Sequence, residues 1–113
     1  MKIDSGDYVL DYDESSDKVQ IIGSLRLNGL EEYAPVLDVL RECLTSTTAM
    51  TVDLSKLEFL NSSGIAMLSK FIIEARSKDD LSLTLLGSSK VPWQGKSLKN
   101  LQRLYPALKL IID

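Results

Sequence analysis

The amino-acid sequence predicts an α/β fold in which a mixed, mostly parallel sheet begins with a hairpin and carries helices packed on it. Two observations predict this class. Runs of alternating apolar and polar residues, typical of strands, recur between runs whose apolar residues repeat every three or four positions, as in amphipathic helices. The elements follow the order ββαβαβαβ, and strands separated by helices are expected to pair in parallel through right-handed crossovers.

The N-terminal part predicts a hairpin followed by a helix. Residues 8–13 and 18–23 are short β-rich runs joined by a polar link of hairpin length, so we expect them to pair antiparallel. The helix is indicated by one apolar stripe, made of Leu30, Tyr33, Ala34, Leu37, Leu40 and Leu44. Asn28 is its expected cap, while Pro35 leaves open a start a few residues later.

The central stretch predicts a strand, a short connection and a second helix. Apolar Met50, Val52 and Leu54 alternate with polar residues, as in a strand covered mainly on one face. After Asn61-Ser62-Ser63 the apolar period changes to that of a helix. We expect Ser62 to lie in the first turn or at the cap, accessible to solvent. The helix residues expected to be buried against the sheet are Ile65, Leu68 and Ile72, with Ala75, Met67 and Phe71 completing the apolar face.

The C-terminal part predicts a strand, a long loop, a helix and a last strand. Leu81, Leu83 and Leu85 alternate with polar residues, and residues 87–97 form the loop. The third helix contains Leu98, Leu101, Leu104 and Tyr105 and is stopped by Pro106. The last strand contains Leu108, Leu110 and Ile112.

The composition is that of one globular domain. The chain has 113 residues, of which 44% are hydrophobic and 26% charged, so it can bury a core. No apolar run approaches the roughly 20 residues that cross a bilayer, and the acidic N-terminal residues differ from a secretory signal. We therefore expect a cytoplasmic protein that binds neither membrane nor, directly, nucleic acid.

The chain has one cysteine and no histidine. Cys43 cannot form an internal disulfide, and its place in a helical apolar run predicts a buried, inert thiol. Zinc sites of the usual kind need several cysteine or histidine ligands and are excluded. We expect no metal and no cofactor.

The charges are unevenly distributed. Residues before Leu81 include 15 of the 16 acidic residues, whereas five of the 13 basic residues follow it with only Asp113 as an acid. This asymmetry is usual for a solvated surface, but it can also orient a charged partner.

Asn61-Ser62-Ser63 is the candidate functional motif. At a helix N-terminus, free amides and the positive end of the dipole favour an anion, and a hydroxyl there can carry a phosphate. Asn and Ser are also common helix caps, and capping alone explains one of the three residues. A catalytic serine on a nucleophile elbow is excluded, because the flanking glycines and a histidine base are missing.

Residues 52–68 resemble the signature of STAS domains, the sulfate transporter and anti-sigma factor antagonist family. Their sequence is Val-Asp-Leu-Ser-Lys-Leu-Glu-Phe-Leu-Asn-Ser-Ser-Gly-Ile-Ala-Met-Leu. In the bacterial antagonist branch the serine after the motif's Asp is phosphorylated by a partner kinase. By position that serine is Ser62, and Asn61 stands where the family usually has Asp. The resemblance implies that residues 1–113 form a single STAS-like domain without the family's usual closing helix. The surface left uncovered is then available to a partner or a second copy, as in a dimer.

The resemblance also implies a function and a binding face. The protein would be a non-enzymatic, phosphorylation-switched regulator of signal transduction and transcription. It would bind an anti-sigma factor or a switch-type serine kinase while Ser62 is unphosphorylated, and a phosphatase would reverse the modification. The face expected to contact the partner comprises Gly23, Ser24, Leu25, Leu60, Asn61, Ser63, Gly64 and Met67.

Two alternatives stay open. The first is an unphosphorylated STAS-like scaffold that uses the same helix face, and Asn61 favours it. The second is a small nucleotide-binding protein, because Gly95-Lys96-Ser97 resembles the end of a phosphate-binding loop. That motif requires a glycine where Lys90 stands, and Pro92 removes one of the backbone amides that would bind phosphate.

Overall fold

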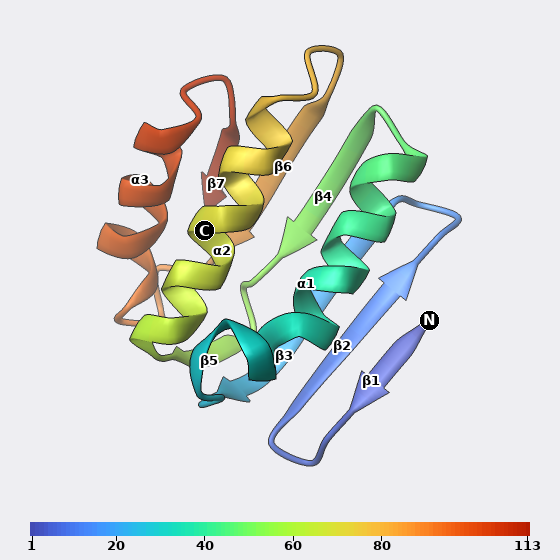
Figure 1. Ribbon diagram of the computed structural model, residues 1–113. Helices are drawn as coiled ribbons and strands as arrows, with labels where there is room; N and C mark the ends of the chain where they lie inside the picture. Colours follow the sequence, from blue (N-terminus) through green and yellow to red (C-terminus); the bar gives the residue numbers. More distant parts are fainter.

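The computed structural model describes all 113 residues, which form one seven-stranded sheet and three helices (Figure 1). The strands are β1 (Lys2–Asp4), β2 (Tyr8–Asp13), β3 (Lys18–Leu25), β4 (Ala49–Asp53), β5 (Leu57–Leu60), β6 (Ser82–Gly87) and β7 (Lys109–Ile112). The helices are α1 (Gly29–Ser46), α2 (Ser62–Arg76) and α3 (Gln94–Leu104). None of these helices combines the length and the apolar character that a membrane span requires.

The sheet has the order β1-β2-β3-β4-β6-β7, and β5 extends it beside the far end of β3. β1, β2 and β3 pair antiparallel, while all later pairings are parallel. The α/β class, the N-terminal hairpin and the parallel remainder are therefore confirmed. β1 and β5 were not predicted, because β1 has only three residues and because the buried residues of β5, Leu57 and Leu60, do not alternate.

All three helices cover the same face of the sheet, so the molecule has two layers (Figure 1). The core lies between the layers, where alternate strand residues such as Leu10, Ile21, Val52 and Leu85 are almost wholly buried. On the opposite face their polar neighbours form a row across the strands, from Asp11 through Gln20 to Asp53. The strand period thus gives one apolar face and an opposite face on which this polar row lies between apolar pairs, Val9 with Ile22 and Leu86 with Ile111.

The first helix begins where the cap was expected. Asn28 occupies the N-cap, although its side chain makes no capping hydrogen bond. Pro35 lies inside α1, so the later start that it left open is not observed. Cys43 is fully buried, as predicted, whereas Leu30 is 44% exposed although it belongs to the predicted stripe.

The third helix begins earlier than the sequence suggested. Gln94 is its first residue, so Gly95, Lys96 and Ser97 lie in its first turn and do not form a phosphate-binding loop. Gln94 fixes this start because its buried side chain donates to the Leu54 and Leu57 carbonyls and accepts from the Ser88 amide at 2.7 Å.

Candidate functional site

The candidate site is the junction between β5 and α2. Asn61 is the N-cap of α2 and Ser62 is its first residue, exposed to solvent, as the change of period predicted. Leu68 and Ile72 are buried and lie on the face of α2 that packs against the sheet. Ile65, which was also expected to be buried, is only partly so, because it packs at the rim of the core.

Every polar atom of the Asn61 side chain has a partner. Its Oδ1 accepts hydrogen bonds from the Gly64 amide at 2.9 Å and from the Tyr33 hydroxyl at 2.7 Å, while its Nδ2 donates to the Leu27 carbonyl at 2.8 Å. The residue therefore caps α2 and ties it both to α1 and to the segment after β3. An aspartate could accept the first two bonds but could not donate the third. The side chain of Asn61 thus matches its surroundings better than the Asp of the STAS motif would.

Gly64 lets the junction close tightly. A Cβ atom at this position would lie 2.1 Å from Cδ1 of Leu60 and 2.8 Å from the Tyr33 hydroxyl. Tyr33 is itself fully buried, and this burial raises the pKa of its phenol, which donates to Asn61 as a neutral group. The small residue after the two serines is therefore required by packing.

The two serines have different surroundings. The Ser63 hydroxyl accepts a 3.2 Å hydrogen bond from the Gly29 amide, which joins the start of α2 to the start of α1. The Ser62 hydroxyl has no partner in the protein, and the backbone amides of both serines are also unbonded. These amides and the helix dipole provide a local environment that favours an anion on Ser62.

Two exposed apolar residues belong to elements that meet at the junction but were not selected by the sequence reasoning, and the register of β5 directs one of them, Phe59, to the uncovered face of the sheet. Phe59 is 39% exposed, and the guanidinium of Arg26 lies 4.6 Å from the centre of its ring. Leu30, next to the Gly29 amide, is exposed as well. Phe59 stands two residues before the cap in an alternation that is irregular, so its exposure had no clear signal in the sequence.

The eight residues expected to contact a partner differ in how accessible they are. Ser24, Asn61 and Ser63 are partly accessible, and so is Gly23. The buried members, which support the surface from beneath, are Leu25, Leu60, Gly64 and Met67. Met67 in particular falls on the core side of α2, because it follows Gly64 by three residues and precedes Phe71 by four.

Gly23 has a backbone role. Its φ angle is +102°, and a Cβ there would lie 2.4 Å from the Asp7 carbonyl oxygen. Its amide donates to the Lys56 carbonyl at 3.1 Å, where β3 changes its pairing from β4 to β5 with a shift of register. Gly23 therefore allows β3 to turn toward β5, which delivers the chain to Asn61.

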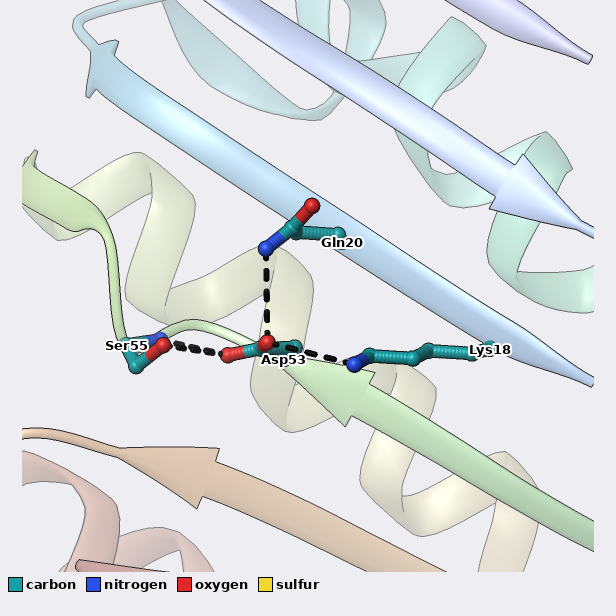
Figure 2. Close-up of polar contacts among 4 residues, drawn as sticks. All are labelled: Lys18, Gln20, Asp53 and Ser55. Atoms are coloured by element: carbon teal, nitrogen blue, oxygen red, sulfur yellow. Dashed lines mark hydrogen bonds and ion pairs between the residues drawn. The ribbon is translucent and has the colours of Figure 1, made fainter. Parts of the chain in front are cut away.

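A second polar cluster lies on the uncovered face of the sheet, at the end of β4 (Figure 2). Asp53 accepts hydrogen bonds from the Ser55 amide at 2.9 Å and hydroxyl at 2.6 Å, from Gln20 at 3.4 Å, and forms an ion pair with Lys18 at 3.6 Å. Burial acts to raise the pKa of Asp53, but the bonds from Ser55 and the charge of Lys18 outweigh it and lower the pKa. The carboxylate is fully engaged, so the cluster ties β3 to β4 and leaves no free base.

Comparisons with known proteins identify the class of fold. No protein-family model matches the chain, and no curated protein matches it in sequence. Apo-SiaC from Pseudomonas aeruginosa superimposes with a TM-score of 0.76 at 15% identity, covering 100% of this chain and 97% of that one. A chain in the complex of the diguanylate cyclase SiaD with its activator SiaC, from the same organism, gives 0.74 at 16% identity, with 99% and 97% covered.

An anti-sigma factor antagonist from Mycobacterium paratuberculosis is also similar. It gives a TM-score of 0.58 at 18% identity, covering 96% of this chain and 82% of that one. The chain therefore has the STAS-like fold that its central motif suggested. At these identities the likeness concerns the fold, so the function has to be argued from the site.

Proposed function

We propose that the protein is a non-enzymatic regulator that binds a partner protein through the surface around the start of α2 and is controlled by phosphorylation of Ser62. One observation carries the proposal. Ser62 has an exposed, unbonded hydroxyl beside two free backbone amides, whereas Asn61 and Ser63 are held by hydrogen bonds. Of the two serines, Ser62 is the one whose hydroxyl a kinase can modify without breaking a native contact.

A phosphate on Ser62 would change this surface strongly. It adds about −1.5 to −2 charge and three acceptor oxygens. The helix dipole stabilises it by only about 0.3 to 1 kcal/mol, whereas burying an unpaired charge in an interface costs about 2 to 5 kcal/mol. Exposed Leu30, next to the Gly29 amide that bonds Ser63, supplies apolar area for a partner that the phosphate would keep away. Binding to unphosphorylated protein and release on phosphorylation follow from this balance.

The similar structures support a protein partner. SiaC is described as the activator of a diguanylate cyclase, and the mycobacterial protein as an anti-sigma factor antagonist. By analogy with the anti-sigma factor antagonist, the first candidate partner is an anti-sigma factor or a switch-type serine kinase, with a phosphatase that restores free Ser62. By analogy with SiaC, the partner is instead an enzyme that this protein activates, and this is the second candidate. The higher TM-scores with SiaC, 0.76 and 0.74 against 0.58, favour keeping this second candidate.

Three forms of the protein test the switch: unmodified, with phosphoserine at Ser62, and with phosphoserine at Ser77. The last form is a matched control, because Ser77 is exposed at the other end of α2. Each form is used as bait in a lysate of the native host, and the captured proteins are quantified by mass spectrometry. We expect the unmodified and Ser77 forms to retain a partner that the Ser62 form loses.

The identity and affinity of that partner decide between the candidates. An anti-sigma factor or kinase supports the first candidate, and a signalling enzyme whose activity rises on binding supports the second. Calorimetry should give a dissociation constant about a hundredfold higher for the Ser62 form, equivalent to about 2.8 kcal/mol. Equal affinities of the unmodified and Ser62-phosphorylated forms would reject the phosphoswitch and leave an unregulated scaffold.

A further inference from the structure

Five of the 13 basic residues of the chain lie toward one edge of the sheet, with a single acidic residue among them. β6, α3 and β7 contain Lys90, Lys96, Lys99, Arg103 and Lys109 in or beside them, and Asp113 is the only acid from Leu81 onward. None of these five cations forms an ion pair within the protein. The β7 edge is therefore electropositive in a chain whose net charge is −3.

A groove runs along this edge between α3 and β7. It has a volume of about 660 Å³, with Leu110 and Ile112 of β7 on one side and Lys99 and Gln102 of α3 on the other. Lys99 and Gln102 also line an adjoining hollow that extends the groove to Arg103. Apolar Leu110 and Ile112 opposite the cation Lys99, with Arg103 in the adjoining hollow, suit a ligand that has both apolar and acidic groups.

The outer edge of β7 has free backbone groups. β7 pairs only with β6, and in the last rung the Asp113 amide donates to the Gly87 carbonyl at 3.2 Å while the Asp113 carbonyl accepts from Ser89 at 2.9 Å. In a parallel ladder the residues that bond to a neighbour alternate with residues whose amide and carbonyl point the other way. Leu110 and Ile112 therefore direct their amides and carbonyls outward.

We propose that the β7 edge binds an extended, acidic segment of a partner protein, which adds to the sheet as a further strand. The outward groups of Leu110 and Ile112 supply main-chain hydrogen bonds, and side-chain pockets supply specificity. Alternate side chains of the added strand would enter the groove beside Lys99 or lie over the uncovered face beside Lys109 and Ile111, which is 50% exposed. Carboxylates at alternate positions of the segment would meet Lys99 on the groove side or Lys109 on the uncovered side.

The charge argues against a second copy of this chain as the occupant. If two β7 edges paired, the basic residues that flank this edge in one copy would come close to those of the other, and like charges brought together repel. An acidic segment reverses the sign of this interaction. This surface shares no residue with the junction around Ser62, so it can be tested without reference to the phosphoswitch.

The probe is an eight-residue peptide in which glutamate alternates with valine, and the control peptide alternates lysine with valine. Amide hydrogen exchange of the full chain is followed by NMR with and without peptide. We expect the glutamate peptide to slow exchange at Leu110 and Ile112 at least tenfold, to bind more weakly as salt is raised, and to leave β1 at the other edge unchanged.

Charge variants provide the matched comparison. Lys99→Glu with Arg103→Glu should weaken binding of the glutamate peptide at least tenfold, while Lys2→Glu on β1 should leave it within twofold. Circular dichroism identifies any variant that fails to fold. In that case Ile112→Pro takes its place and should likewise weaken binding of the glutamate peptide, because it removes an outward amide that bonds to no strand of the protein. Absence of protection at Leu110 and Ile112, equal binding of both peptides, or protection that appears through dimerisation without peptide would overturn the proposal.

Discussion

The side-chain amide of Asn61 donates a 2.8 Å hydrogen bond to the backbone carbonyl of Leu27. An aspartate in its place would keep the helix cap but would set a carboxylate oxygen against that carbonyl. We predict that Asn61→Asp lowers the free energy of unfolding by about 1 to 3 kcal/mol, as expected when a partly buried hydrogen bond loses its donor and the Leu27 carbonyl is left without a partner. Urea unfolding followed by circular dichroism measures this change.

Ser62→Asp is the control for added charge, because it introduces the same carboxylate one residue later at an exposed position. A negative charge in the first turn of a helix is favourable by about 0.3 to 1 kcal/mol, so this variant should be at least as stable as the parent. If Asn61→Asp and Ser62→Asp lowered the free energy of unfolding equally, the added charge, and not the lost amide of Asn61, would be responsible.

Gly64→Ala and Gly95→Ala should have opposite effects, although both glycines lie in the first turn of a helix. A Cβ at Gly64 meets Leu60 and Tyr33, whereas one at Gly95 has nothing within 4 Å. Overpacking should cost Gly64→Ala about 1 to 3 kcal/mol, and Gly95→Ala should gain about 0.5 to 1 kcal/mol from its higher helix propensity. Chemical unfolding decides, and a stabilised Gly64→Ala would show that the junction is loosely packed.

Ser63→Ala should be less stable than Ser62→Ala. The Ser63 hydroxyl accepts a hydrogen bond from the Gly29 amide, and its loss should cost about 0.5 to 1.5 kcal/mol. The Ser62 hydroxyl has no partner, so its removal should change stability by less than about 0.5 kcal/mol. Thermal unfolding of the two variants side by side tests the difference, and the reverse order would assign the structural role to Ser62.

Asp53 should make stability depend on acid pH. Its pKa is lower in the folded than in the unfolded chain, so its stabilisation is present above the ordinary carboxyl value of about 4 and is lost as pH falls through the folded value. Asp53→Asn should therefore be less stable than the parent by about 1 to 3 kcal/mol at pH 7, with the difference shrinking toward pH 3.

Urea unfolding at several pH values measures this effect of Asp53. Asp11→Asn is the control, because Asp11 is an exposed neighbour on the same face without an ion pair, and it should change stability by less than about 0.5 kcal/mol at pH 7. A constant difference between parent and Asp53→Asn across the pH range would contradict the assignment.

Cys43 should react slowly with iodoacetamide in the native protein and rapidly in urea. The side chain is fully buried, and this burial raises the pKa of the thiol, so little thiolate is present and little of it is accessible. Mass spectrometry of the alkylated fraction over time gives the two rates. Native labelling as fast as in urea would show that α1 opens readily, and it would reopen a redox role for this residue.

Periodicity predicted most of the fold, because long amphipathic elements carry a strong signal. The helix face of Leu68 and Ile72 and the burial of Cys43 are examples. Short or irregular segments carry little signal, so β5 was missed, and with it the exposure of Phe59. The start of α3 was misplaced because Gln94, a polar residue, is fixed by bonds to carbonyls about 40 positions earlier in the chain.

The position of Ser62 in the candidate site was predictable, but the roles of its neighbours were not. Capping propensity left Asn61, Ser62 and Ser63 equivalent. The bonds of Asn61 to Gly64, Tyr33 and Leu27 and the bond of Ser63 to Gly29 distinguish them. Met67 was placed both in the apolar face and on the binding surface, and the structure puts it in the core. Long-range contacts of this kind are absent from a local pattern.

The separation of charge across the sheet gives the molecule a permanent electric dipole moment. Asp4, Asp7, Asp11, Asp13, Glu14 and Asp17 lie in or beside β1 and β2, at the edge opposite the basic β7. A charged surface therefore exerts a torque on the protein as well as a net force. Near an anionic surface at low salt, the molecule would orient with β7 foremost, despite carrying the same sign of net charge.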